Sequence, residues 1–351
     1  ASAFTILFLF WTITHLARKF FAKDENISTA NSIAIIGSGA VGALAYTFSD
    51  TFWFSAVEAE VYATSSLFTA MVFWAILKWE NEADDKYANR WLILIAYLMG
   101  LSIGVHLLNL LAIPAIVFVY YFKKYNVTRK GIIVALLSSG VILGSIMYII
   151  IPGVVKVASW FDLLFVNGFG LPYNSGFLFY IVLLIGLIIW GLKYTQQKGK
   201  VLLNTIILGV TVILIGYSSF AVIVIRSAAD PPMDQNNPDN VFDLLYYLNR
   251  EQYGDRPLVY GHTFDAPAIS NKKTKPVYIK KDGRYVIAEY KIEVEFDPRF
   301  ETLFPRMYSG DANHVREYKK WVNLQGDEIS ITGRGQAEKR IKPSFGDNIA
   351  F

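Results

Sequence analysis

The chain has 351 residues, of which 54% are hydrophobic and only 18% charged, and its mean hydropathy is +0.35. This composition is too apolar for a single soluble core and indicates a membrane protein. Although the formal net charge is +4, the excess cations fall between apolar runs, which predicts membrane topology rather than nucleic-acid binding, and the absence of cysteine excludes disulfides and thiolate metal sites.

Eight apolar segments in the first 226 residues predict membrane-spanning helices. They are residues 3–17, 31–49, 61–77, 91–104, 107–122, 132–152, 176–192 and 202–225. The fourth and fifth segments are short, but Gly104 and His106 lie between them, so we expect a tight hairpin rather than one long helix. The predicted fold class is a polytopic α-helical membrane domain over residues 1–226.

The basic clusters between these segments test the layout. With eight spans, one face of the membrane receives Arg18, Lys19, Lys23, Lys78, Lys86, Arg90, Lys123, Lys124, Arg129, Lys130, Lys193, Lys198 and Lys200. Only Lys156 and Arg226 fall on the other face, so the positive-inside rule makes the crowded face cytoplasmic. The opposite face then receives residues 50–62, the turn at His106, the loop 153–175 and everything after residue 226.

Two short segments of the membrane domain have a pattern of their own. Residues 154–166 predict a helix lying in the membrane interface, followed by a Gly/Pro/Asn-rich turn at 167–176. The motif GSGAVGA at 37–43 lies inside a span, so its glycines favour close helix packing over phosphate binding.

The polar region begins with a linker at residues 227–240, where prolines and Asx residues exclude regular structure. Residues 241–351 predict a small, incomplete α+β region outside the membrane. Its expected elements are a helix reaching about residue 249, a strand at 257–261, a hairpin at 276–296 around Asp282 and Gly283, and a helix at 311–323.

The stretch WFSAVEAEVYA, residues 53–63, carries the first candidate binding residues: Glu58, Glu60 and Tyr62, with Asp50 shortly before them. Two residues apart on a helix are separated by about 200°, so either this segment is irregular or only one glutamate faces a ligand. One interpretation is a solvated loop beside an interfacial aromatic belt. The other is a site in which carboxylates and aromatic faces bind a sugar or its acceptor.

A second group of candidates lies further along the chain. His106 interrupts an apolar run, where a histidine either packs in the protein or faces a cavity, and Asn109 lies on the same helical side. Arg226 ends the last span, as a snorkelling anchor or as a clamp for phosphate. No paired metal-ligand spacing occurs, and the sequence leaves the use of a divalent cation open.

Three stretches together carry a family resemblance: residues 53–63, residues 100–115 (GLSIGVHLLNLLAIPA) and residues 225–261 (IRSAADPPMDQNNPDNVFDLLYYLNREQYGDRPLVYG). In these the chain resembles the transmembrane protein 260-like group, whose bacterial members are the Bacteroidota membrane proteins of glycosyltransferase family 117. That family is similar to protein O-mannosyltransferases, which have the C-type glycosyltransferase fold.

The resemblance implies an enzyme of the bacterial inner membrane that moves mannose or a similar hexose from a polyprenyl-phosphate carrier to a hydroxyl of a protein or peptide on the periplasmic side. The C-terminal region would then be periplasmic. In this setting Asp50, Glu58, Glu60 and Tyr62 suit sugar or acceptor contacts, and His106, Asn109 and Arg226 suit contacts with the phosphate carrier.

The chain departs from the family pattern at its start, because the first outer loop, which supplies the catalytic carboxylate in related enzymes, is absent. We therefore expect an internal fragment whose general base lies upstream of Ala1, which is inactive by itself, and we assign no catalytic residue. Two other classes compete: a secondary transporter using the carboxylates and His106 as an ion relay, although no paired repeat is visible, and a non-catalytic component of an envelope assembly.

Overall fold

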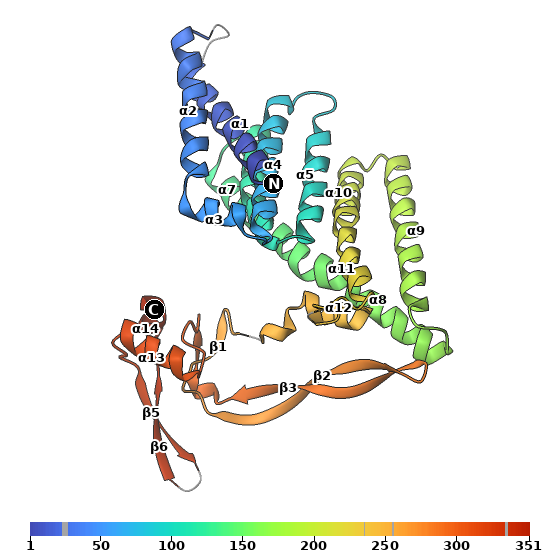
Figure 1. Ribbon diagram of the computed structural model, residues 1–351, viewed down its shortest axis with the longest axis vertical. Coiled ribbons are helices and arrows are strands. Elements are labelled where there is room, and N and C mark those ends of the chain that lie inside the picture. Colours follow the sequence, from blue (N-terminus) through green and yellow to red (C-terminus); the bar gives the residue numbers. More distant parts are fainter. Residues whose placement is uncertain (23–26, 235, 255, 334–335) are drawn as a thin grey trace. The chain divides into compact units, whose positions relative to one another are not determined.

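The computed structural model describes residues 1–22, 27–234, 236–254, 256–333 and 336–351, so Lys23 and Gln235, which belong to a predicted basic cluster and to the predicted linker, lie outside the described residues. The chain is mostly helical and divides into two compact units (Figure 1). The helical unit comprises residues 1–162 and 174–245, and the β unit comprises residues 163–173 and 246–351. The domain boundaries expected at residues 226 and 240 stay predictions.

Each of the eight predicted spans overlaps helical segments of the structure. The helices are α1 (Ser2–Phe21), α2 (Thr29–Thr47), α3 (Asp50–Val57), α4 (Tyr62–Glu82), α5 (Asn89–Ile103), the 3-10 helix η1 (Leu107–Ala112), α6 (Ile113–Lys124), α7 (Arg129–Gly144), α8 (Ile151–Leu163), α9 (Ser175–Gln197), α10 (Val201–Tyr217), the 3-10 helix η4 (Ser218–Phe220), α11 (Ala221–Ser227) and α12 (Val241–Leu248). In the part of the chain that the structure describes, six helices are long and apolar enough to cross a membrane. The bent pair α3–α4 makes a seventh if it counts as one span, and α5 is a shorter apolar helix.

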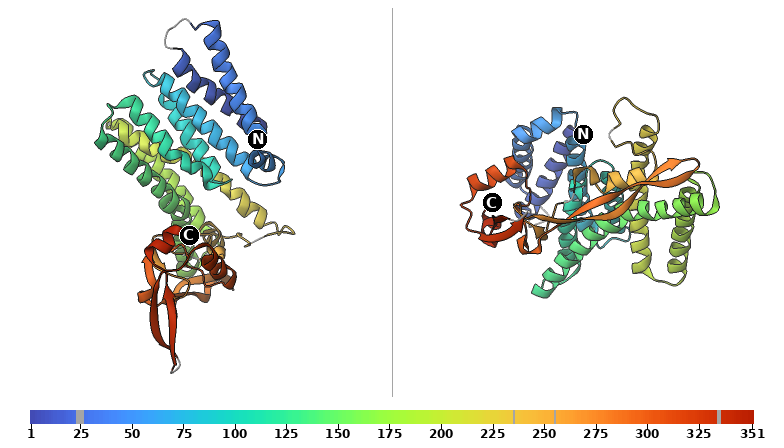
Figure 2. Two further views of the ribbon diagram at one scale, coloured as in Figure 1. Left: turned by 90° about the vertical axis from the view of Figure 1, so that its left-hand side faces the viewer. Right: turned by 90° about the horizontal axis from the view of Figure 1, so that it is seen from below.

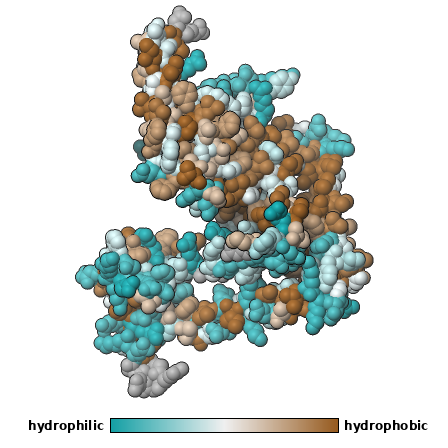
Figure 3. Space-filling view, in the orientation of Figure 1, coloured by the Kyte–Doolittle hydropathy of each residue, from teal (hydrophilic) through white to brown (hydrophobic). Residues whose placement is uncertain are grey.

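Much of the apolar surface of these helices has no protein neighbour. Ile33 on α2, Leu137 on α7 and Val182 on α9 are each more than 60% exposed, and brown apolar surface covers the helices in Figure 3. A soluble monomer rarely exposes apolar patches of this size. These helix faces are therefore suited to contact with lipid chains.

The segment after residue 129 differs from the sequence prediction. Instead of a span at 132–152 followed by a separate interfacial helix, one continuous helix runs from Arg129 to Gly168, including π-helical turns at Ser145–Ile150 (η2) and Leu164–Gly168 (η3). Pro152 lies just after the first of these turns. Proline lacks an N–H donor and its ring crowds the preceding turn, and a widened π turn relieves both problems without ending the helix.

Ion pairs bring three of the basic clusters to one end of the helical unit. Lys19 bonds to Glu80 at 2.5 Å, Arg90 to Glu82 at 2.7 Å and Lys124 to Asp84 at 3.0 Å. The end of α6 thus lies beside the end of α4. Because α5 begins shortly after α4 ends, α5 and α6 run in opposite directions, as the expected hairpin requires. Figures 1 and 2 show the helices of this unit lying side by side.

Helices α5 and α10 pack through glycines at a contact too close for larger side chains. A Cβ added at Gly216 would lie 2.5 Å from the backbone nitrogen of Leu101, and one at Gly100 would collide with the carbonyl of Ile213. Since Gly100 and Leu101 near the end of α5 meet Ile213 and Gly216 near the end of α10, the two helices run in parallel. Lys198 and Lys200, just before α10, therefore lie at the same end of the unit as Arg90. Of the glycines in residues 37–43, Gly39 and Gly42 lie close to side chains of α1, since a Cβ at Gly39 would meet Phe10 at 2.9 Å and one at Gly42 would meet Ile13 at 2.5 Å, whereas nothing lies within 4 Å of a Cβ at Gly37.

A buried carboxylate organises the start of α9. Asp162 has no solvent exposure, and it accepts backbone hydrogen bonds from Gly176 at 3.1 Å and from Asn174 and Phe177 at 3.3 Å. A negative charge at a helix N-terminus satisfies donors that have no partner within the helix.

We expect Asp162→Ala to destabilise the protein by about 2 kcal/mol, because it leaves these buried N–H groups unpaired. Thermal unfolding of the detergent-solubilised protein measures the loss. Asp85→Asn, which changes an exposed carboxylate in the loop after α4, is the control. Equal unfolding temperatures for the two variants would contradict the capping role.

The β unit contains three antiparallel pairs. The strands are β1 (Tyr260–His262), β2 (Ala268–Lys281), β3 (Arg284–Phe296), β4 (Glu301–Leu303), β5 (Asp327–Gly333) and β6 (Gln336–Lys342), paired β1–β4, β2–β3 and β5–β6, with α13 (Ala312–Trp321) and α14 (Phe345–Ala350) beside them. The expected hairpin is confirmed: Asp282 and Gly283 have φ of 49° and 76°, as a tight two-residue turn requires. The helix expected at 311–323 is confirmed as α13, which Asp311 caps. The hairpin β5–β6 is not among the elements expected from the sequence, and its second strand, QAEKRIK, has no alternating apolar pattern.

His262, on β1, stacks on the ring of Phe296 at 3.8 Å between centroids, and burial lowers the pKa of its imidazole below the usual 6.5, although Glu301 opposes the shift. The fold therefore favours neutral His262, and stability is lost as the pH falls from 6.5 through the lowered pKa. We expect hydrogen exchange in β1 and β4 to accelerate in that range, and His262→Gln to remove the acceleration. His314→Gln, an exposed histidine on α13, is the control, and an unchanged pH profile in His262→Gln would refute the assignment.

Candidate functional site

The candidate site lies at the sharp bend between α3 and α4. The axes of the two helices differ by 116°, and residues 58–61 between them are not helical. Phe52 anchors the short helix α3, since it is buried and packs against Tyr46 at 4.5 Å between ring centroids. The irregular alternative predicted for this stretch is the observed one, so Glu58 and Glu60 do not occupy opposite faces of a helix.

The three candidate carboxylates are exposed at this bend. Asp50 is the first residue of α3, Glu58 follows its last residue, and Glu60 lies in the connecting segment. Trp53 and Phe54 on α3 are more than half exposed beside them. Acidic and aromatic side chains are thus presented to the surroundings together, which suits the recognition of a polyhydroxylated ligand by hydrogen bonds and ring stacking.

Tyr62 and His106, which are 44 positions apart in the sequence, meet in the structure. Their rings lie 5.7 Å apart between centroids, with an angle of 55° between the planes. His106 is half-buried at the break between α5 and η1, and its Nδ1 accepts a hydrogen bond from the backbone N–H of Leu108 at 3.1 Å. This bond starts η1 and leaves Nε2 as the ring nitrogen available for a ligand.

Asn109, three residues after His106, is fully buried. Its amide nitrogen donates to Ser102 Oγ at 3.1 Å and approaches Met99 Sδ at 3.3 Å, and both partners are on α5. Its Oδ1 has no hydrogen-bond partner among the residues that the structure describes. Asn109 therefore joins η1 to α5. The sequence contains no signal for Ser102 and Met99 as partners of Asn109, because the helix break between them removes any periodic spacing.

Arg226 is exposed near the end of α11, and no ion pair joins it to a carboxylate in the described part of the chain. The break that holds His106 is nevertheless near this segment. A Cβ added at Gly104 would lie 2.8 Å from Ser219 Oγ on η4, just before α11. Arg226 follows Ser219 by seven residues, about 10 Å along a helix, so the structure places it at the same end of the unit as His106 without direct contact.

The site offers hydrogen-bond acceptors, aromatic faces and an imidazole, but no assembled metal centre. Among the residues that the structure describes, no three histidine or acidic side chains are grouped so that they could hold a metal ion. The chemistry available from these residues is recognition of hydroxyl groups at the bend and donation to an anion by His106.

Comparison with known proteins adds two matches. Residues 1–129 match the model of the protein O-mannosyl-transferase TMEM260 N-terminal domain, and residues 254–351 match a family of unknown function (DUF8416). No curated protein and no solved structure matches the chain significantly. The first match contains the bend, Tyr62, His106 and Asn109, whereas Arg226 lies outside both. The first match thus covers less than half of the chain and shows that residues 1–129 are similar to the N-terminal domain of protein O-mannosyl-transferase TMEM260.

Proposed function

We propose that this protein is a glycosyltransferase of the bacterial inner membrane that transfers mannose or a similar hexose from a polyprenyl-phosphate carrier to a protein hydroxyl on the periplasmic side. The family match over residues 1–129 is the observation that carries the proposal. In the proposed topology all eight helical segments span the membrane, and the bend at α3–α4 and the polar region after residue 226 are periplasmic.

The reaction joins the acceptor oxygen to the anomeric carbon of the sugar and breaks the bond between that carbon and the phosphate oxygen. A base removes the acceptor proton, and the electron pair of the broken bond leaves with the phosphate. We propose that Asp50, Glu58 and Glu60 accept hydrogen bonds from sugar or acceptor hydroxyls and that Tyr62 covers one face of the sugar. His106 and Arg226 would stabilise the departing phosphate, where new charge develops, while buried Asn109 holds the turn.

The experiment that tests this proposal measures the transfer of labelled hexose from a polyprenyl phosphate to a peptide by the purified full-length protein. Cysteine labelling at position 58 in sealed vesicles tests the topology at the same time. We expect transfer, and labelling from the periplasmic side alone. If no sugar is transferred and position 58 is labelled from the cytoplasmic side, the proposed topology and the proposed reaction are both wrong. Ion-coupled uptake without sugar transfer would favour a transporter.

Replacing His106 tests its proposed contact with phosphate. We expect His106→Phe to preserve the ring contact with Tyr62 and to reduce transfer by about 100-fold, the usual order for the loss of one donor to a developing anion. His314→Phe, in the β unit, is the matched control. Full activity in His106→Phe would mean that His106 only packs against Tyr62.

A further inference from the structure

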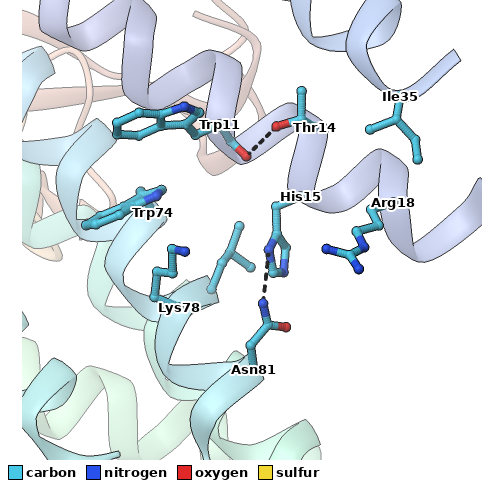
Figure 4. A pocket seen from close by; sticks show the side chains of 9 residues that line it. Trp11, Thr14, His15, Arg18, Ile35, Trp74, Lys78 and Asn81 are labelled. Atoms are coloured by element: carbon cyan, nitrogen blue, oxygen red, sulfur yellow. Dashed lines mark hydrogen bonds between the residues drawn. The ribbon is translucent and has the colours of Figure 1, made fainter. Parts of the chain in front are cut away.

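A cavity of about 470 Å³ opens between α1, α2 and α4, at the other end of α4 from the candidate site (Figure 4). Tyr62 at the bend and Lys78 at the cavity are 16 residues apart on α4, or about 24 Å along the helix axis. That distance approaches the thickness of the hydrocarbon core of a bilayer. The cavity is therefore separate from the candidate site and lies at the end of the unit where the basic clusters gather.

The lining of this cavity is divided into an apolar part and a cationic part. Trp11 and Trp74, whose rings lie 5.8 Å apart, form the apolar lining together with Ile35 and Leu77. The polar part consists of Arg18, Lys78, His15, Asn81 and Thr14, and no carboxylate lines the cavity among the described residues. Figure 4 shows His15 between Arg18 and Lys78.

The nearby acidic residues are already engaged by other cations. Glu80 bonds to Lys19 at 2.5 Å, and Glu82 accepts from Arg90 at 2.7 Å. Within the described ranges, Arg18 and Lys78 form no ion pair, and Lys78 instead lies over the ring of Trp74 at 5.7 Å. Two cations that line one cavity and form no ion pair within the described chain favour an anionic ligand.

His15 adds a hydrogen-bond donor to the same cavity. Its Nδ1 faces the amide nitrogen of Asn81 at 3.4 Å, and because that nitrogen can only donate, the imidazole proton is on Nε2. Nε2 is buried and has no hydrogen-bond partner in the part of the chain that the structure describes. A buried donor without an acceptor is costly, and an oxygen atom of a ligand in the cavity would satisfy it.

We propose that this cavity binds a phosphate group carried on an apolar chain, with Arg18, Lys78 and His15 holding the phosphate oxygens and Trp11 and Trp74 covering the chain. Phosphate matches the planar guanidinium of Arg18 and the ammonium of Lys78. An anionic phospholipid supplies both parts, and basic pockets between membrane helices bind such headgroups. The site is independent of sugar transfer.

The test reconstitutes the full chain in vesicles of phosphatidylcholine containing brominated phosphatidylglycerol, or brominated phosphatidylcholine for comparison. Bromine quenches tryptophan fluorescence at short range, so Trp11 and Trp74 report occupancy. We expect at least twofold stronger quenching by the anionic lipid, lost in Arg18→Gln/Lys78→Gln and halved in each single variant. Trp11→Phe/Trp74→Phe should remove the same component of the signal.

The control is Lys193→Gln/Lys198→Gln, which removes the same charge from the end of α9, away from the cavity. An equal loss of quenching in this control would show a general attraction to an anionic surface and would overturn the site. An unchanged preference for the anionic lipid in Arg18→Gln/Lys78→Gln would also overturn it. The last measurement adds inorganic phosphate or glycerol phosphate as a competitor of the quenching lipid. Competition by these ions would support a phosphate site that is open to soluble ligands, whereas quenching insensitive to them would assign it to a lipid headgroup.

Discussion

Replacing both glutamates of the α3–α4 bend, as Glu58→Gln/Glu60→Gln, is expected to reduce sugar transfer by the full-length protein by about 100-fold or more. Both side chains are exposed at a break between helices, so their removal leaves the packing of the helical unit intact. Glutamine keeps the size but replaces an anionic acceptor with a neutral amide. The loss would therefore report on ligand contacts rather than on folding.

The single variants separate the two positions. Because the segment is not helical, either glutamate or both can reach the same ligand, and initial rates for Glu58→Gln and Glu60→Gln show which one does. Asp85→Asn, an exposed carboxylate in the loop that follows α4, is the control and should keep the wild-type rate. If the double variant also transfers sugar at that rate, the two glutamates form only a solvated loop.

Gly216→Val is expected to cause the largest loss of stability, about 3 kcal/mol. The added Cβ would lie 2.5 Å from the backbone nitrogen of Leu101 and 2.7 Å from the carbonyl oxygen of Tyr97. Backbone atoms cannot move aside as a side chain can, so α10 would have to separate from α5. Thermal unfolding and the yield of monodisperse protein in detergent measure the effect.

Gly209→Val on the same helix is the matched control. Nothing lies within 4 Å of a Cβ added at Gly209, and valine is a better helix former than glycine. We expect this variant to unfold at the wild-type temperature or slightly above it. A similar loss in both variants would mean that valine weakens α10 itself and that the close contact with α5 contributes little.

The helical framework could be predicted from the sequence because long apolar runs and basic clusters are local signals. All eight expected spans overlap helical segments, and the turn at Asp282 and Gly283 and the helix at 311–323 were expected from their residue types. The long helix from Arg129 to Gly168 was not foreseen. Proline at position 152 reads as a break in a sequence, whereas a π turn allows the helix to continue in the structure.

The residues of the candidate site could be predicted from the sequence, but their contacts could not. The sequence singled out Glu58, Glu60, Tyr62 and His106 by their types alone, because charged and polar groups are conspicuous in an apolar chain. It could not show that Tyr62 and His106 touch, or that Asn109 is buried against Ser102, since these contacts depend on how α4, α5 and η1 pack.

Apolar length and charge distribution by themselves predicted a helical domain with segments long enough to cross a membrane and a polar C-terminal region, because transfer from water to lipid depends on composition over a short window. Only the tertiary structure decided which residues share a site. The glycine contact of α5 with α10 and the cavity lined by Arg18 and Lys78 both arise from helices that are distant in the sequence. Such contacts are set by side-chain shape across an interface, which no local pattern records.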